Sequence, residues 1–161
     1  MSGMTIEKAT LDHLTPEALA DIEKLFTTGF EKELVKRKFS WRNFVLYWEL
    51  ALLLPWNALW LLFDKEEHIV GIIGGIIYPN MLTNDVIATE TCWRTAASVK
   101  GKGLGWDLLA TFIEWAAFLG ATRITTHRFL SKNAAADERF DDKIRKMGFY
   151  PSGCEYYMDL K

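Results

Sequence analysis

The sequence predicts an α/β fold in which a mixed β-sheet is flanked by about four helices, with residues 1–161 forming one domain. Half of the 161 residues are apolar, which is enough to bury about two-thirds of the surface of the unfolded chain. Apolar residues recur at helical spacing in some segments and alternate as in strands in others. Over 85–120, a strand, a glycine-containing loop and an amphipathic helix follow one another, which predicts a crossover between neighbouring parallel strands.

The N-terminal part predicts a strand and two helices. A short alternating segment over 4–8 is the first strand, and Thr15 followed by Pro16 is typical of a helix start. We expect this helix to reach the middle thirties, and Ser40 to cap a second helix. Four aromatic residues of the second helix either shape a substrate pocket or, as we favour, pack in the core: Trp41, Phe44, Tyr47 and Trp48.

Two strands over 58–63 and 69–78 follow, and the polar turn between them predicts a hairpin. The second strand contains three glycines, which indicate either a bulge or the close approach of another group: Gly71, Gly74 and Gly75. The apolar stretch 45–63 is long enough to cross a bilayer, but Pro55 and Asn57 divide it. We therefore expect a buried helix and a buried strand there, and no membrane span.

The C-terminal part predicts a strand, a helix and a final strand. The first of these strands covers 123–129, and Ser131 or Asn133 begins the helix. Acidic residues lie in the first turn of the helix and basic residues in its last, the order that the helix dipole favours. Gly148 ends the helix, and the last strand covers 155–160.

Charge and cysteine content restrict the partners and the compartment. With a net charge of −2 and a pI near 5.9, the chain lacks the overall basic field that attracts nucleic acid, so we do not expect a nucleic-acid partner. Cys92 and Cys154 lie far apart and without nearby histidines at metal spacing, so we expect two free thiols and no metal site. The first ten residues lack the apolar segment of a signal peptide. These features favour a cytoplasmic protein.

The central loop reads Lys100-Gly101-Lys102-Gly103-Leu104-Gly105 and directly precedes a helix. Backbone N–H groups at a helix start lack partners, and together with the positive end of the helix dipole they attract anions. Glycines allow a phosphate to approach closely, and the lysines add positive charge. The loop therefore predicts a di- or triphosphate site. The alternative interpretation is a surface turn that happens to contain glycine and lysine. Trp106 stands where the dinucleotide-binding pattern requires glycine, which excludes that pattern.

The pattern Lys100-x-x-Gly103-x-Gly105 resembles the pyrophosphate loop R/Q-x-x-G-x-G/A of the GNAT superfamily, whose members transfer acyl groups from acyl-coenzyme A, usually to amines. Lysine at the first position departs from that pattern. Glu90-x-x-Trp93 before the loop and Glu114-Trp115-Ala116 in the helix look most like small GNAT proteins encoded by bacteriophages. For a phage protein, the compartment would be the cytoplasm of the bacterial host.

The resemblance implies a GNAT-like fold with acetyl-CoA, or another acyl-CoA, as cosubstrate. The pyrophosphate would meet the loop, and the pantetheine arm would enter between two parallel strands that splay apart. A backbone N–H just after Trp93 would polarise the thioester carbonyl. The cofactor-binding residues that the resemblance implies are Trp93, Arg94, Thr95, Lys100, Gly101, Lys102, Gly103, Leu104, Gly105, Trp106 and Asn133.

Glu90 is the first candidate for catalysis, since GNAT enzymes often use a glutamate on this strand as a general base. We expect it on the strand face opposite Trp93, and pairing with Arg94 is the alternative role. His127, near the end of the next strand, is the second candidate base. Many GNAT enzymes carry a tyrosine, four residues before a Gly-Phe pair, that protonates the leaving thiolate; Ile144 stands there. The remaining proton donors are Tyr150, Tyr156, Tyr157 and solvent.

The predicted function is an N-acyltransferase, most simply an N-acetyltransferase, that acts on an amine of a protein or a small molecule. Because Ile144 replaces the usual tyrosine, the alternative is a catalytically weak or inactive GNAT-fold protein that binds a host or phage protein. The sequence does not fix the oligomeric state, and a homodimer is one possibility.

Overall fold

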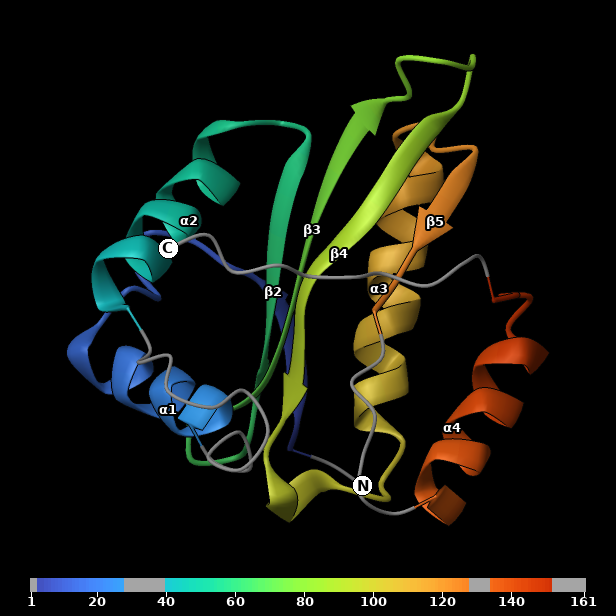
Figure 1. Ribbon diagram of the computed structural model, residues 1–161. Helices are drawn as coiled ribbons and strands as arrows, with labels where there is room; N and C mark the ends of the chain where they lie inside the picture. Colours follow the sequence, from blue (N-terminus) through green and yellow to red (C-terminus); the bar gives the residue numbers. More distant parts are fainter. Residues whose placement is uncertain (1–2, 28–39, 128–133, 152–161) are drawn as a thin grey trace, which may run out of the picture. The chain divides into compact units, whose positions relative to one another are not determined.

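The computed structural model describes residues 3–27, 40–127 and 134–151 (Figure 1). The chain divides into two compact units, Met1–Thr126 and His127–Lys161. The second unit holds helix α4 (Ala134–Lys146). The first unit holds, in chain order, β1 (Thr5–Lys8), α1 (Pro16–Thr27), α2 (Trp41–Leu53), β2 (Asn57–Phe63), β3 (Ile69–Pro79), β4 (Val86–Thr95), the short 3-10 helix η1 (Ala97–Val99), α3 (Leu104–Phe118) and β5 (Arg123–Thr125).

The strands of the first unit form one sheet in the order β1-β2-β3-β4-β5. The first four strands pair antiparallel, whereas β4 and β5 are parallel and are joined by α3. This arrangement confirms the predicted mixed sheet. The predicted hairpin is formed by β2 and β3, and the predicted crossover by β4, α3 and β5.

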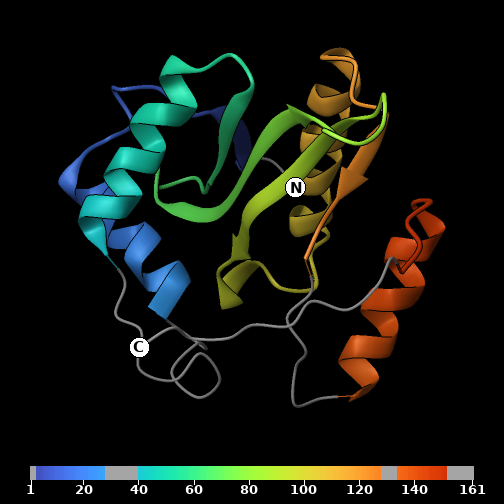
Figure 2. The same cartoon turned by 45° about the horizontal axis from the view of Figure 1, so that its top comes forward.

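Helices cover both faces of this sheet, with α1 and α2 on one face and α3 on the other (Figure 2). Trp60 of β2 meets Trp115 of α3 edge to face, with ring centroids 5.3 Å apart. An apolar cluster lies under α1 and α2 and confirms that Phe44 and Trp48 pack in the core. Its members include Ile22, Leu25, Phe44, Trp48, Leu59, Leu61 and Ile72.

Two glycines let helices approach β3 from opposite faces. A Cβ atom at Gly74 would lie 2.0 Å from the hydroxyl of Tyr47 in α2. A Cβ atom at Gly75 would lie 2.3 Å from Cε2 of Phe112 in α3. The pairing of β3 with β4 also shifts by one residue between these glycines. The close approach expected for this strand is therefore observed on both faces, whereas the extra residue of the bulge lies on β4, opposite these glycines.

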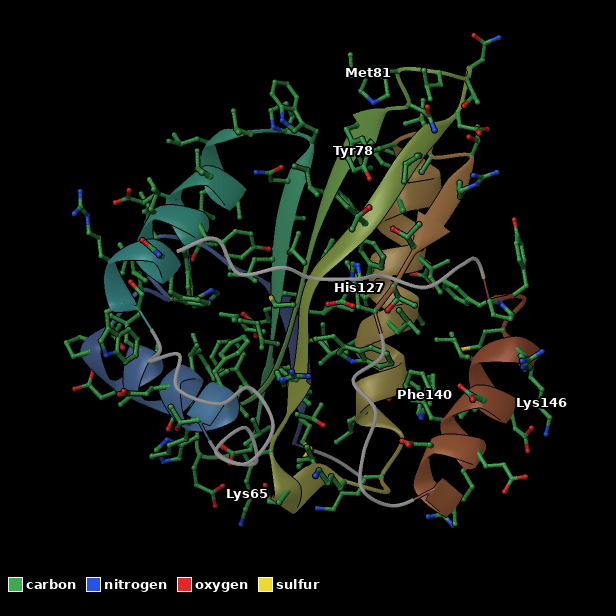
Figure 3. All side chains as sticks on the ribbon, viewed as in Figure 1. Lys65, Tyr78, Met81, His127, Phe140 and Lys146 are labelled. Atoms are coloured by element: carbon green, nitrogen blue, oxygen red, sulfur yellow. The ribbon has the colours of Figure 1, made fainter. Side chains whose placement is uncertain are left out.

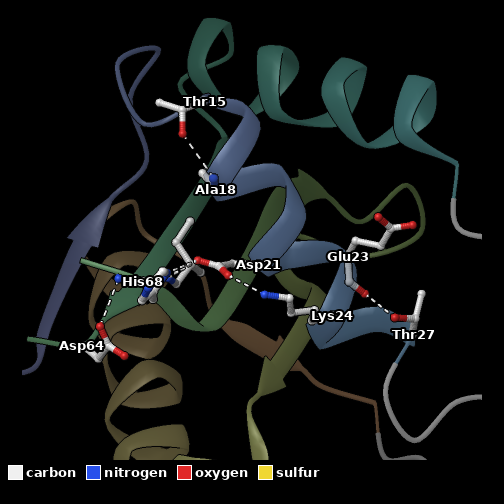
Figure 4. A network of polar contacts seen from close by, with 9 residues as sticks. Thr15, Ala18, Asp21, Glu23, Lys24, Thr27, Asp64 and His68 are labelled. Carbon is white, nitrogen blue, oxygen red and sulfur yellow. Dashed lines mark hydrogen bonds and ion pairs between the residues drawn. The ribbon is translucent and has the colours of Figure 1, made fainter. Parts of the chain in front are cut away.

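Asp21 anchors α1 to the turn between β2 and β3 (Figure 4). Its Oδ2 lies 3.1 Å from Nδ1 of His68 and accepts a hydrogen bond from the backbone N–H of Ile69 at 3.2 Å. Its Oδ1 pairs with the ammonium group of Lys24 at 3.3 Å. A single carboxylate therefore links the middle of α1 to the start of β3.

Among the element ends that the described residues include, the cap of α2 agrees with the sequence and the end of β5 does not. The Ser40 hydroxyl accepts a hydrogen bond from the N–H of Asn43 at 3.4 Å, which is the predicted cap of α2. The expected extension of α1 beyond Thr27 lies outside the described residues. β5 ends at Thr125, so the predicted strand over 123–129 is too long at residues 126 and 127, while 128 and 129 lie outside the described residues. The last pair joins Thr125 to Thr89, and directly after it the pairing of β4 with β3 shifts by one residue, which interrupts the regular course of β4.

Helix α4 has the charge order that was predicted for it. Asp137 lies in its first turn, and the basic residues of its last turn are Lys143, Arg145 and Lys146. Gly148 follows with a φ of 94°, and its N–H donates to the carbonyl of Arg145 at 2.9 Å, which ends the helix as expected. The predicted final strand over 155–160 lies outside the described residues.

The apolar stretch 45–63 is divided between α2 and β2. Within the described ranges, no helix is long and apolar enough to cross a membrane.

Candidate cofactor and catalytic site

The parallel strands β4 and β5 separate in the middle of β4. They pair at only three positions, and the last pair joins Thr89 to Thr125. β4 continues to Thr95 with no further partner on β5 among the described residues. Over the described residues, the pairing therefore stops at Thr89 and Thr125 although 126 and 127 follow, which is consistent with the divergence that the GNAT resemblance implied.

A β-bulge lies directly after the last of these pairs. Gly75 of β3 pairs with Glu90, whereas Gly74 pairs with Cys92, so Thr91 is the extra residue on β4. A bulge bends its strand and increases the local twist. Its position on β4 coincides with the point at which β5 is no longer paired.

The bulge also changes which side chains share a face of β4. Glu90 lies opposite Gly75, and Trp93 lies opposite Ile73. Because these two β3 residues are two positions apart, Glu90 and Trp93 both register with the face that α3 covers. The prediction that they lie on opposite faces is wrong, since it assumed regular alternation and Thr91 adds one residue.

The loop between β4 and α3 presents backbone N–H groups that have no acceptor among the described residues. The carbonyl of Gly103 in the same loop already accepts two hydrogen bonds, from the N–H of Trp106 at 2.8 Å and from the N–H of Asp107 at 3.2 Å. Free donors at a helix start, together with the helix dipole, form a site for an anion. The free donors belong to Gly101, Gly103, Leu104 and Gly105.

Two glycines of this loop require a left-handed backbone. Gly101 has a φ of 79° and Gly103 a φ of 86°. A Cβ atom at either position would meet nothing within 4 Å, so the space beside both residues is open. Lys100 and Lys102 are exposed and add positive charge next to it. The residues present therefore fit a group with paired phosphates.

Trp93 ties the end of β4 to the first turn of α3. Its indole N–H donates to the carbonyl of Gly105 at 3.0 Å. Its ring meets that of Trp106 edge to face, with centroids 5.5 Å apart. Gly105 also lies against Thr95, whose Cγ2 would be 3.4 Å from an added Cβ atom. These contacts fix the loop relative to the strand.

Glu90 is buried where the strands separate. Its side chain is 5% exposed, and its Oε2 accepts a hydrogen bond from the Thr126 hydroxyl at 3.0 Å. A buried carboxylate needs such donors, because leaving it unsolvated and unbonded is costly. Thr126 lies one residue beyond β5. Nothing in the local sequence indicates this partner, since the contact depends on the register of two strands.

Two groups near Glu90 have shifted pKa values. Burial lowers the pKa of the Arg94 guanidinium below its usual value, while the charge of Glu90 acts in the opposite direction. Desolvation raises the pKa of the Cys92 thiol to about 12, and the Glu90 carboxylate adds to this rise. Cys92 is a free cysteine and stays a neutral thiol near pH 7.

The remaining candidates are not part of the first unit. His127 and Tyr150 belong to the second unit, and both are exposed. Asn133 lies outside the described residues, as do Tyr156 and Tyr157. The structure thus gathers Glu90 with the strand and loop residues from Trp93 to Trp106.

Comparisons with known proteins agree with this geometry. A model of the acetyltransferase (GNAT) family matches residues 17–149. The fold is similar to that of a transcriptional regulator from Bacillus halodurans C-125, with a TM-score of 0.75 and 21% identity over 98% of this chain and 99% of that chain. A comparison with curated protein sequences finds no match.

Two solved acetyltransferases have the same fold at lower identity. Glucosamine-6-phosphate N-acetyltransferase from Arabidopsis thaliana has a TM-score of 0.70 and 10% identity, over 98% of this chain and 99% of that chain. AAC(6')-Iy, in complex with the bisubstrate analog CoA-S-monomethyl-acetylneamine, has a TM-score of 0.70 and 13% identity, over 99% of both chains. Together with the match over most of the sequence, these findings show that the chain belongs to the acetyltransferase (GNAT) family.

Proposed function

We propose that the protein transfers an acyl group, most simply acetyl, from acyl-coenzyme A to an amine of a protein or a small molecule. The observation that carries this proposal is the combination of free loop amides and diverging strands in one unit. The amides suit the pyrophosphate, and the separation of β4 from β5 suits a thin pantetheine arm. Relatives act on amines, and the identity of the acceptor is left to experiment.

The loop would bind the nucleotide part of the cosubstrate. The N–H groups of Gly101, Gly103, Leu104 and Gly105 would donate to phosphate oxygens. Lys100 and Lys102 would add attraction that is sensitive to salt, since both are exposed. The contacts of Trp93 with Gly105 and Trp106 would keep these donors in place.

Glu90 would take the proton that the acceptor amine loses. As the amine nitrogen bonds to the acyl carbon, the carbon–sulfur bond breaks and the thiolate leaves. The backbone N–H of Arg94, just after Trp93, would polarise the carbonyl during this step. The departing thiolate would take a proton from Tyr150, a later tyrosine or solvent. Structural pairing with Arg94 is the alternative role of Glu90.

A second candidate function rests on one residue. Ile144 occupies the position at which many GNAT enzymes have the acidic tyrosine. Without that proton donor, the protein would keep the fold and the coenzyme A site but act by binding another protein. Binding of coenzyme A without turnover on any extract would support this second function.

The test is thiol release from acetyl-CoA in the presence of cell extract. We expect release that depends on extract, and a drop of roughly 100-fold or more in Glu90→Gln, the usual range for a lost general base. Glu114→Gln is the control, because Glu114 is an exposed residue of α3. Equal rates in the wild type and Glu90→Gln would contradict the role of Glu90, and no release with any extract would contradict the enzyme.

A further inference from the structure

The β4 bulge has contacts on the face opposite Glu90 that the proposed chemistry does not use. Tyr47 of α2 reaches this face, and its hydroxyl lies 2.5 Å from the hydroxyl of Thr91, the extra residue of the bulge. Residues 47 and 91 are far apart in sequence, so the bond joins a helix to the strand. It lies one residue from Glu90 and two from the last β4–β5 pair at Thr89.

Gly74 makes this contact sterically feasible. An added Cβ atom there would lie 2.0 Å from the Tyr47 hydroxyl and 2.9 Å from the Thr91 hydroxyl. Any larger residue would therefore displace the tyrosine from the bulge. On the other face of β3, an added Cβ atom at Gly75 would lie 2.3 Å from Cε2 of Phe112. The strand opposite the bulge is thus held between one side chain of α2 and one of α3.

Burial keeps the Tyr47 side chain in its hydroxyl form. Desolvation raises the pKa of Tyr47 far above its ordinary value, and the charge of Cys92 in its thiolate form would raise it further. A buried hydroxyl is costly to leave without a partner, so the bond to Thr91 stabilises one position of the bulge over its neighbours. A bulge without such a partner could shift along the strand, because register is weakly specified in glycine-rich strands.

We propose that Tyr47 is a positioning residue that, through its bond to Thr91 and the clearance at Gly74, fixes the bulge where β4 must leave β5. This proposal rests on the proposed function, because it assigns a purpose to the divergence: an opening for the pantetheine arm beside Glu90. Tyr47 acts through Thr91 and is given no contact with the substrate.

A second tyrosine–threonine pair on the same strands provides a matched control. The hydroxyl of Tyr78 lies 3.1 Å from that of Thr89, which in turn lies 2.8 Å from that of Thr125. Tyr78 lies near the end of β3 that leads to the hairpin loop with Met81 (Figure 3). There β4 is still paired with β5, so loss of the Tyr78 hydroxyl should not affect the divergence.

The experiment compares calorimetric binding of acetyl-CoA and of ADP, which has the paired phosphates without the pantetheine arm. We expect Tyr47→Phe and Thr91→Val each to weaken acetyl-CoA binding by about tenfold, the factor for one lost hydrogen bond, and to leave ADP binding unchanged. The double variant should lose less than the two single losses added together, because the changes share the bond between Tyr47 and Thr91, while each side chain also has a hydrogen bond with Cys92. Tyr78→Phe should bind both ligands like the wild type.

The possible results separate the two proposals. If the wild type binds both ligands and Tyr47→Phe and Thr91→Val bind acetyl-CoA equally well, the positioning role is overturned while the proposed function stands. Equal weakening towards both ligands would indicate a general structural role and would also overturn it. A wild type that binds neither ligand would overturn both proposals. If Tyr47→Phe melts below the assay temperature, Thr91→Val decides, because Thr91 is exposed and valine keeps the size of its side chain.

Discussion

At the scale of single residues, the surroundings of each polar group decide what it can do. Glu90 is buried next to the last β4–β5 pair, and its Oε2 accepts a hydrogen bond from the Thr126 hydroxyl. Cys92, two residues from Glu90, is a weak nucleophile near neutral pH, because burial raises the pKa of its thiol to about 12. Gly101 and Gly103 have left-handed φ values, and a Cβ atom at either position would meet nothing within 4 Å.

The raised pKa of Cys92 predicts slow alkylation. Because the pKa is about 12, the thiolate fraction at pH 8 is far smaller than for an ordinary cysteine, and it should rise about tenfold per pH unit up to that value. We expect iodoacetamide to modify native Cys92 much more slowly than the unfolded chain, in a Cys154→Ser background. Rapid modification of the native protein at pH 8 would contradict this environment.

Single residues were predicted from sequence where their role depends on the backbone nearby. Gly101 and Gly103 were identified in this way, and both have positive φ. Thr126 and the pairing of Tyr47 with Thr91 were not found, because each contact joins segments that are distant in sequence.

At the scale of elements, α2 and α3 pack closely against β3 at Gly74 and Gly75, where the strand has no side chains. Phe112 of α3 approaches Gly75 so closely that no side chain fits between them. This contact lies on the face where Glu90 and Trp93 register. The packing of α3 against β3 therefore also supports the part of β4 that carries the candidate base.

Gly75→Ala tests this packing. The added Cβ atom would lie 2.3 Å from Phe112, so we expect a loss of about 1–3 kcal/mol in the free energy of unfolding, as for other overpacked cores. Urea denaturation measures the loss. Combining the change with Phe112→Leu should cost less than the two single losses added together, because the smaller side chain leaves room. Strict additivity would show that the ring is not what excludes a side chain here.

Most elements were predicted because their apolar spacing is a local signal, as for β2, β3 and α3. β5 was predicted too long for the opposite reason: Arg123 to Thr125 pairs with β4, whereas Thr126 and His127 are described but are not part of a strand, and this depends on distant residues. The bulge at Thr91 could not be located from the sequence either, because it is defined by how β4 pairs with β3, and this pairing joins distant segments of the chain.

At the scale of the whole molecule, an acidic chain has a small basic site. The net charge is −2, yet the loop before α3 combines two exposed lysines with free amides. The proposed attraction for a polyphosphate would therefore be local and not a property of the overall field. Solved structures of 10–21% identity have the same fold, so the fold is retained while the surrounding side chains differ.

The central claim is that the loop amides hold the paired phosphates of coenzyme A. Its most direct test is calorimetric titration of coenzyme A into the wild type, Gly103→Val and Gly120→Val. Gly120 is the matched control, because it has a φ of 82° and equally open surroundings but lies after α3, so valine there strains the backbone without touching the loop. We predict that Gly120→Val binds like the wild type and that Gly103→Val loses measurable binding while still melting cooperatively. Unchanged affinity in a folded Gly103→Val would contradict the claim.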